Sequence, residues 1–325
     1  MSAQATEAVR PSPGRRRAAT LAGADGMAVW LVVAALAVVL AVRSPDTFLT
    51  TDNAANLLSQ LVVLALVALG QTFVVLTGGI DLSVGSLATL TAVLTAGLID
   101  GYPIRVLPVL LLVLLLGALA GAAHGTLVTR SRMVPFVVTL ASFYLLQGLA
   151  FAYTTTPVGA IPNDLAAFAL LNIGPFPAIF LVALAIFAGL AWVLARTTFG
   201  RHVYAVGGDA DVARSAGIRT GRVTVAAYVI CSMLAALAGF LLAAKATVGT
   251  PSAGAELELS AITAVVLGGT SLFGGRGRVI GTAGGVVLLA LVENAFTLLH
   301  ISSFYQDLVR GAVIVAAVAV FTRKD

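Results

Sequence analysis

The chain has 325 residues, of which 59% are hydrophobic and only 10% are charged, and its mean hydropathy is +1.04. Soluble domains carry about 25% charged residues, so this composition excludes a water-soluble protein and indicates an integral membrane protein. The net charge of +5 is spread over short segments instead of forming one patch, so no nucleic-acid partner is expected.

Ten apolar windows predict an all-α integral membrane protein with about ten transmembrane helices. The windows are 27–42, 57–77, 84–99, 106–128, 136–152, 177–195, 223–244, 259–273, 279–299 and 307–321. Several are shorter than the roughly 20 residues that a full span needs, and the eighth is expected to be bent or re-entrant. Residues 1–20 are expected to be a disordered cytoplasmic tail, and residues 21–325 a single transmembrane domain. Nine windows follow the first, so it is expected to be an uncleaved helix and not a signal peptide.

The basic residues test this count independently. With the amino terminus inside and the ten segments alternating, 15 of the 19 basic residues fall on the cytoplasmic side, as the positive-inside rule expects. Both termini are therefore expected in the cytoplasm. The basic residues assigned to the cytoplasm are Arg10, Arg15–Arg17, Arg130, Arg132, Arg196, Arg201, Arg214, Arg219, Arg222, Arg276, Arg278, Arg323 and Lys324. The four assigned to the outside are Arg43, Arg105, Lys245 and Arg310.

The segment Gly70–Thr91, GQTFVVLTGGIDLSVGSLATLT, places polar residues and glycines between two apolar windows. In lipid such groups must be satisfied without bulk water, so this segment is expected to hold helices together or to let a polar solute pass. Gly78–Gly79 are expected to end the second span. Asp81 is expected to cap the third by accepting from amides near Ser83 and Val84, with direct substrate contact as the alternative.

Five polar side chains in or near the predicted spans are candidates to line a translocation path. They are Gln71, Ser83, Gln147, Glu293 and Asn294. For each of them the alternative role is a hydrogen bond between helices. Glu293 fits that alternative least well, because a charge within a span normally faces a polar interior.

Two windows carry glycines at four-residue spacing, which lets two helix backbones approach closely in lipid. Packing within the chain is the favoured interpretation, and a contact between two copies is the alternative. The two rows are Gly117, Gly121 and Gly125 in the fourth window, and Gly277, Gly281 and Gly285 at the start of the ninth.

The longest predicted cytoplasmic loop, 196–218, should contain a short helix over Ala210–Ala216. Asp209 is a suitable N-cap, because its carboxylate can accept from the amides two and three residues further on. Gly217 can end the helix in a left-handed conformation. The helix is either a docking site for a cytoplasmic partner, since small side chains beside Arg214 suit a groove, or a solvated connector.

The sequence lacks the motifs of several enzyme classes. The glycine-rich run Gly268–Gly285 has no Lys after its glycines, so it is not a Walker A loop, and any ATP must bind another chain. The three histidines are far apart, the single Cys231 lies inside a span, and no Ser/His/Asp arrangement is suggested by spacing. We therefore expect no catalytic residues, metal site or cofactor on this chain.

Three stretches together resemble the ribose/xylose/galactose-type sugar permeases of bacterial ABC importers. They are VVLTGGIDLSVGS at 74–86, FGRHVYAVGGDADVARSAGI at 199–218 and LGGTSLFGGRGRVIGTAGG at 267–285. The resemblance covers residues 27–322, and the motifs stand in the family's order. Branched-chain amino acid permeases share the layout, but TGGIDLSVG fits the sugar branch better. An ion-coupled secondary transporter is the other alternative, although such a protein should place paired charges or an ion site in its bundle.

The resemblance implies that the chain works in the bacterial cell (inner) membrane with several partners. Two copies, or two similar chains, would form the pore, and an ATP-binding subunit, often two fused domains, would bind ATP and magnesium. A periplasmic or extracellular binding protein would deliver the sugar. The resemblance also implies that the loop helix is a coupling helix that docks on the ATP-binding subunit. The coupling residues it implies are Gly208, Asp209, Val212, Ala213, Arg214, Ser215, Gly217 and Ile218.

Overall fold

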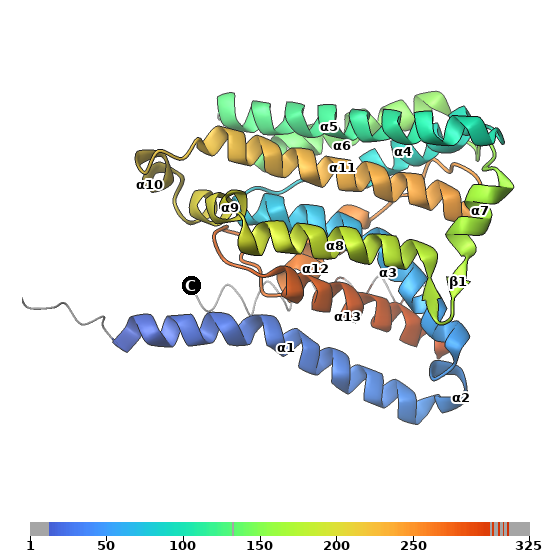
Figure 1. The fold of residues 1–325 in the computed structure, drawn as a ribbon, viewed down its shortest axis with the longest axis horizontal. Helices are drawn as coiled ribbons and strands as arrows, with labels where there is room; N and C mark the ends of the chain where they lie inside the picture. Colours follow the sequence, from blue (N-terminus) through green and yellow to red (C-terminus); the bar gives the residue numbers. More distant parts are fainter. Residues whose placement is uncertain are drawn as a thin grey trace, which may run out of the picture.

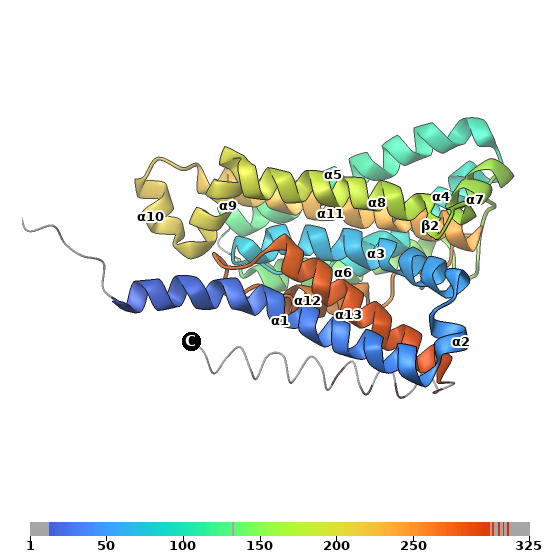
Figure 2. The ribbon, with the colours of Figure 1, turned by 60° about the horizontal axis from the view of Figure 1, so that its bottom comes forward.

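The structure is a computed structural model that describes residues 13–131 and 133–299, together with 301, 305, 308 and 311. Its long helices lie side by side in one bundle (Figures 1 and 2). The elements in chain order are α1 (Pro13–Arg43), α2 (Pro45–Phe48), α3 (Thr51–Leu76), α4 (Val84–Ile99), the 3₁₀ helix η1 (Pro103–Arg105), α5 (Val106–Arg130), α6 (Pro135–Tyr153), α7 (Asn163–Leu170), β1 (Asn172–Ile173), β2 (Phe176–Pro177), α8 (Ala178–Arg196), α9 (Thr198–Gly208), α10 (Ala210–Ser215), α11 (Thr220–Ala246), α12 (Leu257–Leu267) and α13 (Val279–Leu298). The strands β1 and β2 pair antiparallel in a short hairpin.

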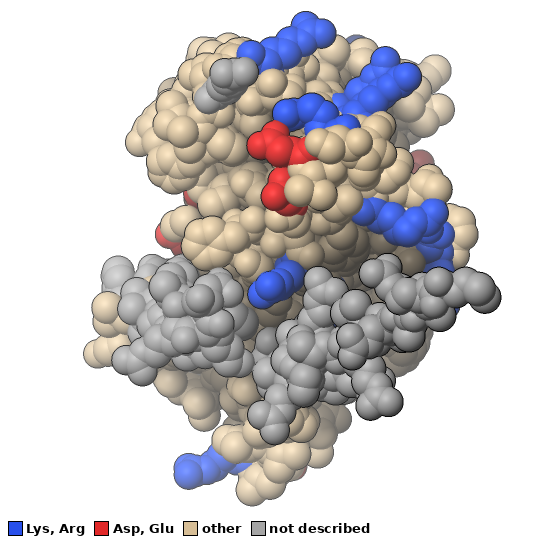
Figure 3. All heavy atoms as spheres, turned by 90° about the vertical axis from the view of Figure 1, so that its left-hand side faces the viewer, with Lys and Arg blue, Asp and Glu red and all other residues tan. Residues whose placement is uncertain are grey.

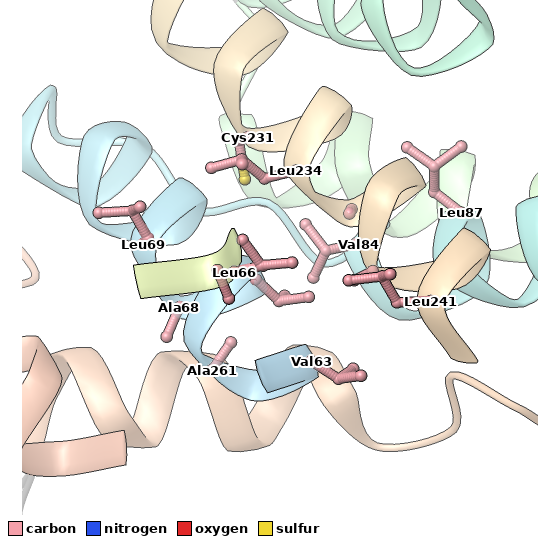
Figure 4. Close-up of a cluster of buried hydrophobic side chains, with 14 of the residues drawn as sticks. Val63, Leu66, Ala68, Leu69, Val84, Leu87, Cys231, Leu234, Leu241 and Ala261 are labelled. Atoms are coloured by element: carbon pink, nitrogen blue, oxygen red, sulfur yellow. The ribbon is translucent and has the colours of Figure 1, made fainter. Parts of the chain in front are cut away.

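Helices α3 and α11 form the centre of the bundle. Residues on all sides of α3, such as Val62, Val67 and Phe73, are fully buried, as expected for a helix that is apolar all round. Helix α11 packs against α3, α4 and α5, and α12 packs against α3 and α13. Figure 4 shows side chains of α3, α4, α11 and α12 meeting in the resulting core, among them Leu66 and Leu241.

Helix α5 shows how the outer helices divide between core and surroundings. Residues four apart form rows on a helix surface, and α5 has one exposed row and one buried row. The exposed row is Leu107, Leu111, Leu115 and Leu119, and the buried row is Val109, Val113, Gly117, Gly121 and Gly125. An exposed row of leucines is unfavourable in water, so it marks the lipid-facing side of the bundle.

The predicted packing role of the glycine rows is confirmed. A Cβ on Gly117 would lie 2.7 Å from the carbonyl oxygen of Ser232, and one on Gly125 would lie 2.6 Å from the Cα of Val225, both on α11. On α13, Gly285 abuts the backbone of α12 and Gly281 abuts that of Gly268, which follows α12, in the same way. Gly277 precedes α13 and abuts the side chain of Thr270 instead. The glycines therefore let helices of this chain touch through their backbones.

The first nine predicted windows correspond to apolar helices of the structure. Six helices in the described part of the chain are long and apolar enough to cross a membrane, namely α3, α5 with η1, α6, α8, α11 and α13. The described apolar stretch Ala28–Arg43 of α1, and helices α4 and α12, are shorter. Helix α12 has 11 residues and rises only about 16 Å, which agrees with the bent or re-entrant segment expected there.

The ends of the chain leave part of the predicted topology open. The tenth window lies almost wholly outside the described residues, so the count of ten crossings stays a prediction. Helix α1 begins at Pro13 and so overlaps the tail predicted over residues 1–20, of which residues 1–12 lie outside the described part.

The two ends of the bundle differ in structure and charge. The α10 end carries α9, α10 and the connection between α12 and α13, and the α7 end carries α2, α7 and the β1–β2 hairpin (Figure 1). Lys and Arg side chains are spread over the α10 end, as Figure 3 shows. The basic residues that close α5 and α8, Arg130 and Arg196, lie at this end, whereas Lys245 lies in the last turn of α11 at the other.

Substituting one glycine of the α5 row should destabilise the bundle. A Cβ on Gly121 would overlap the backbone of Tyr228, so we expect Gly121→Ala to lower stability by about 1–3 kcal/mol through overpacking. Gly189→Ala on α8 is the matched control, because nothing lies within 4 Å of that position, and it should be neutral or stabilising by up to about 1 kcal/mol. Thermal unfolding midpoints of the detergent-purified proteins test this. Equal midpoints for the two variants would contradict the packing described.

Candidate functional site

Three segments that are distant in the sequence meet at the α10 end, and we call their meeting place the glycine junction. The Gly275 amide donates to the carbonyl oxygen of Leu76, the last residue of α3, at 3.0 Å. A Cβ on Gly274 would lie 2.8 Å from the amide nitrogen of Gly78, and one on Gly275 would lie 2.7 Å from the Cα of Gly208. The junction therefore joins the end of α3, the end of α9 and the α12–α13 connection, backbone against backbone.

The junction depends on glycine for both space and conformation. Gly78, Gly274 and Gly275 have φ angles of +80°, +87° and +69°, which residues with a Cβ rarely adopt. A Cβ on Gly207 would overlap the carbonyl oxygen of Leu76. The three stretches that carry the sequence resemblance contribute these glycines, so their separate motifs form one structural unit.

Tyr204 of α9 adds a polar contact to the junction. Its hydroxyl donates to the carbonyl oxygen of Gly277 at 3.0 Å. Burial raises the pKa of Tyr204, partly offset by the positive charge of Arg278, so the phenol keeps its proton at neutral pH and remains a donor. Helix α9 is thus tied to the α12–α13 connection by its side chain as well as by its backbone.

The predicted helix beyond the junction is present as α10. The Asp209 carboxylate accepts from the amides of Asp211 at 2.9 Å and of Val212 at 3.0 Å, which confirms the N-cap. Gly217 has φ +83° and follows the helix end, as expected. Two details were wrong: α10 ends at Ser215, one residue earlier than predicted. The stretch before it, expected as loop, is helix α9, whose first turn is capped by the Thr197 hydroxyl.

The side chains of α10 differ in what they offer to a partner. Val212 is 65% exposed, and Arg214 forms an exposed ion pair with Asp211 at 2.9 Å. Ala213 is buried and packs inward, so of the expected coupling residues it does not present a contact surface here. Ser215 donates to the carbonyl oxygen of Asp211, within the helix.

A hollow of about 360 Å³ lies beside α10, between α9 and the start of α11. Its lining combines small residues with basic ones. The lining residues are His202, Ala216, Gly217, Ile218, Arg219, Arg222 and Val223. The hollow therefore offers a positively charged recess next to an exposed apolar side chain.

Residues 77–83 connect α3 to α4 without forming a helix, and we call them the polar break. Side chains from several helices satisfy the hydrogen-bonding groups of this break. The Asp81 side chain is fully buried, and its Oδ1 accepts from the amide of Ser83 at 2.9 Å and from the hydroxyl of Ser83 at 2.6 Å. The carboxamide of Gln71, oriented to satisfy both of its ends, donates to the Asp81 carbonyl oxygen at 3.2 Å and accepts from the Asp81 amide at 3.1 Å. Thr139 of α6 and Tyr228 of α11 both donate to the carbonyl oxygen of Ile80.

These bonds agree with the capping expectation for Asp81, and its contact with a substrate stays a prediction. Asp81 holds the turn that leads into α4, as the capping prediction stated, although among the described residues Ser83 supplies both donors and Val84 supplies none. Its full burial leaves no surface for a solute to touch in this conformation. Gly78–Gly79 keep their structural role, since a Cβ on Gly79 would lie 2.6 Å from the Tyr228 hydroxyl oxygen.

The second carboxylate oxygen of Asp81 faces a histidine that sequence reasoning set aside. Oδ2 lies 3.8 Å from Nδ1 of the buried His124, and among the described residues neither atom has a hydrogen-bond partner. His124 Nε2 lies 2.6 Å from the Ser142 hydroxyl. The spacing of these residues in the sequence did not suggest this grouping of Asp, His and Ser. The Oδ2–Nδ1 separation exceeds a hydrogen bond, so the three residues link the break, α5 and α6 rather than form a proton relay.

The five residues predicted for a translocation path do not meet in one place. Gln71 and Ser83 are buried around Asp81. Gln147 donates to the carbonyl oxygen of Pro251 at 3.0 Å, and Asn294 donates to Asn53 at 2.7 Å. The Asn294–Asn53 contact joins two helices, α13 and α3, as the interhelical alternative stated, whereas the others hold the connections between helices. The part of all five residues in a path stays a prediction.

Glu293 was expected to lie within a span and to face a polar interior. It is only partly buried, and it lies in the last two turns of α13, toward the α7 end. Among the described residues the buried carboxylate is that of Asp81. No three His, Cys, Asp or Glu side chains of the described residues lie together as metal ligands would.

A bundle of apolar helices whose internal polar break is satisfied by its own side chains is a multi-pass membrane protein. Residues 53–318 match the family described as the branched-chain amino acid transport system / permease component, and the chain belongs to this family. Its members are transport subunits and not enzymes themselves, and they work with ATP-binding and substrate-binding partners.

The curated relatives sharpen this assignment. The chain is 41% identical to the ribose import permease protein of Bacillus subtilis, over 89% of this chain and 90% of the relative. It is 31% identical to the D-allose transport system permease protein of Escherichia coli K12, over 91% of each chain. It is 30% identical to the galactose/methyl galactoside import permease protein of Haemophilus influenzae, over 91% and 94% of the two chains. The resemblance to sugar importer permeases is thereby confirmed, and no solved structure matches the chain.

Asp81 should tolerate an amide better than a methyl group. Asp81→Asn keeps an oxygen that can accept from Ser83, so we expect uptake by the assembled transporter to be partly retained. Asp81→Ala leaves the Ser83 donors buried without an acceptor, at a cost of about 1–3 kcal/mol, and should abolish uptake. Solute uptake, normalised to the amount of permease in the membrane, is the measurement. Complete loss of uptake in Asp81→Asn at normal membrane levels and normal assembly would count against the capping role.

Proposed function

We propose that this chain is the membrane-spanning subunit of an ATP-driven importer that moves a monosaccharide or a related polyol into the cytoplasm. Its curated relatives, which cover nine-tenths of its length, are permeases for ribose, allose and galactose, and this observation carries the proposal. The chain crosses the cell membrane ten times, with both termini and the α10 end inside. The basic residues at the α10 end support that orientation.

Helix α10 is the docking element for an ATP-binding subunit. The exposed Val212 offers an apolar contact, and the adjoining hollow offers Arg219 and Arg222 to acidic side chains of the partner. ATP and magnesium bind to that partner, which carries two fused ATP-binding domains, and this chain binds no cofactor of its own. A second copy of the permease completes the membrane pore, and a binding protein outside the cell delivers the sugar to the α7 end.

The glycine junction gives docking a mechanical consequence. Close backbone contacts leave little room for adjustment, so a movement of α9 and α10 is passed to the end of α3 and to the α12–α13 connection. ATP-driven closure of the partner would therefore rock these elements and switch the pore between outward-open and inward-open states. The buried links at Asp81 keep the break after α3 intact during this movement.

A charge placed on the exposed face of α10 should separate the permease from its partner. Val212→Asp puts a carboxylate where an apolar contact is expected, so co-purification of the ATP-binding subunit and solute uptake should both fall about tenfold or more. Ile104→Asp is the matched control, because Ile104 is 85% exposed in η1 after α4, away from α10, and this change should leave co-purification unchanged. Retained association and uptake in Val212→Asp would contradict the docking role.

The substrate class is tested by transport. The permease, co-expressed with the ATP-binding and solute-binding proteins encoded next to it, should accumulate radiolabelled sugar in cells that lack their own sugar importers. Ribose is the first sugar to try, with allose, galactose and a polyol beside it. Uptake of leucine but of none of the sugars would instead support the branched-chain amino acid alternative suggested by the family's description.

A further inference from the structure

The segment between α11 and α12 runs back into the bundle before α12 begins. Near the α7 end, Gly249 and Val158 exchange two backbone hydrogen bonds of 2.9 and 3.0 Å. From there the segment follows α4 inward, and the Gly254 amide donates to the Thr89 hydroxyl at 3.0 Å. Thr89 stands ten residues before the end of α4 at Ile99, so Gly254 lies about 15 Å inward from that end. Since the hydrocarbon core of a bilayer is about 30 Å thick, the segment reaches its middle.

The backbone of this segment is irregular and strained at two positions. Thr247 and Glu256 have φ angles of +62° and +64°, although neither residue is glycine. Such conformations are unfavourable, persist only where the surrounding structure imposes them, and cluster at functional sites. The strain bends the chain out of α11 and then turns it into α12.

On one side of this segment the side chains are exposed and are not covered by other helices of the described chain. Ser252, Ala255 and Glu256 are exposed, and Leu259 in the first turn of α12 is 48% exposed. The Gln147 carboxamide of α6 donates to the carbonyl oxygen of Pro251, which places α6 beside the same segment.

Glu258 stands at the boundary between this open side and the core. Its side chain is partly exposed, whereas its Oε2 is buried against Gly85 at the start of α4 and has no hydrogen-bond partner among the described residues. An ionised carboxylate only accepts hydrogen bonds, so the exposed part of this side chain can take donors from a bound molecule, while the buried Oε2 stays packed against Gly85.

Lipid cannot cover this side of the protein. Irregular backbone at membrane depth occurs only where it is buried in protein or lines a water-filled cavity, and carboxylates in a membrane face a polar interior. The leucine row of α5 shows what a lipid-facing side of this chain looks like, and it carries no charge.

We infer that residues 251–259, together with Gln147, line the sugar passage, and that Glu256 and Glu258 accept hydrogen bonds from sugar hydroxyls there. This inference rests on the proposed function and adds the residues that meet the solute. Hydroxyl groups are donors that suit carboxylate acceptors, and hydrogen bonds to a charged group are the stronger kind. A neutral polyol passes such a site more readily than an anion, because two carboxylates repel negative charge.

Cysteine labelling in intact membranes tests whether this side is wet. The chain has one cysteine, Cys231, which is fully buried and provides an unreactive background. Ser252→Cys and Ala255→Cys should react with a charged, membrane-impermeant maleimide at least about tenfold faster than Leu115→Cys, the control on the leucine row. Slow reaction with the charged reagent and fast reaction with a lipid-soluble maleimide would overturn the inference. The labelling result does not depend on which solute is carried, so it is separable from failure of the proposed function.

Charge-neutral variants test the role of the carboxylates in the assembled transporter. Glu258→Gln keeps the shape packed against Gly85 but loses the charge, so sugar uptake should fall about tenfold while membrane level and co-purification of the ATP-binding subunit stay unchanged. Glu256→Gln should also lower uptake. Unchanged uptake in both variants would overturn the carboxylate role, even if the labelling shows a wet surface.

Discussion

The structure depends on one constraint: inside a membrane, every backbone break must be satisfied by the protein itself. The chain breaks its helices after α3 and again before α12, and it meets the constraint differently at the two places. After α3, side chains of Gln71, Thr139 and Tyr228 bond to the backbone of Ile80 and Asp81, and the break is buried. Before α12, the non-helical segment is hydrogen-bonded to α4, but the side chains on its other side are exposed. A closed break suits a fixed joint, and an open one suits a passage.

The closed break lies close to the glycine junction, and in the proposed importer this proximity links the bundle to the ATP-binding subunit. The same short stretch that carries Gly78 into the junction carries Asp81 into the core. On the other side of the junction, α9 leads directly to the capped helix α10. A force applied at α10 therefore reaches the centre of the bundle through backbone contacts, without a flexible loop in between.

Sequence reasoning could predict the features that depend on local chemistry. The apolar windows predicted the helices, Asp209 and Gly217 indicated the two ends of α10, and the glycine spacing indicated close helix packing. Each of these features depends on residues that are near one another in the chain. Sequence reasoning missed the Asp81–His124–Ser142 group and the meeting of the three motifs, because both depend on which helices become neighbours. A single sequence does not show which of its helices become neighbours in the fold. Sequence reasoning also placed Glu293 within a polar interior, because the sequence shows the residue type but not its position along the bundle.

The central claim is that the glycine junction transmits the movement of α10 to the bundle. The most direct measurement is the number of sugar molecules imported per ATP hydrolysed by the assembled transporter carrying Gly207→Ala. The added Cβ overlaps the carbonyl oxygen of Leu76 without touching the exposed face of α10. The account predicts that the ATP-binding subunit still associates and hydrolyses ATP while import per ATP falls sharply. An unchanged ratio in a correctly assembled transporter would contradict it.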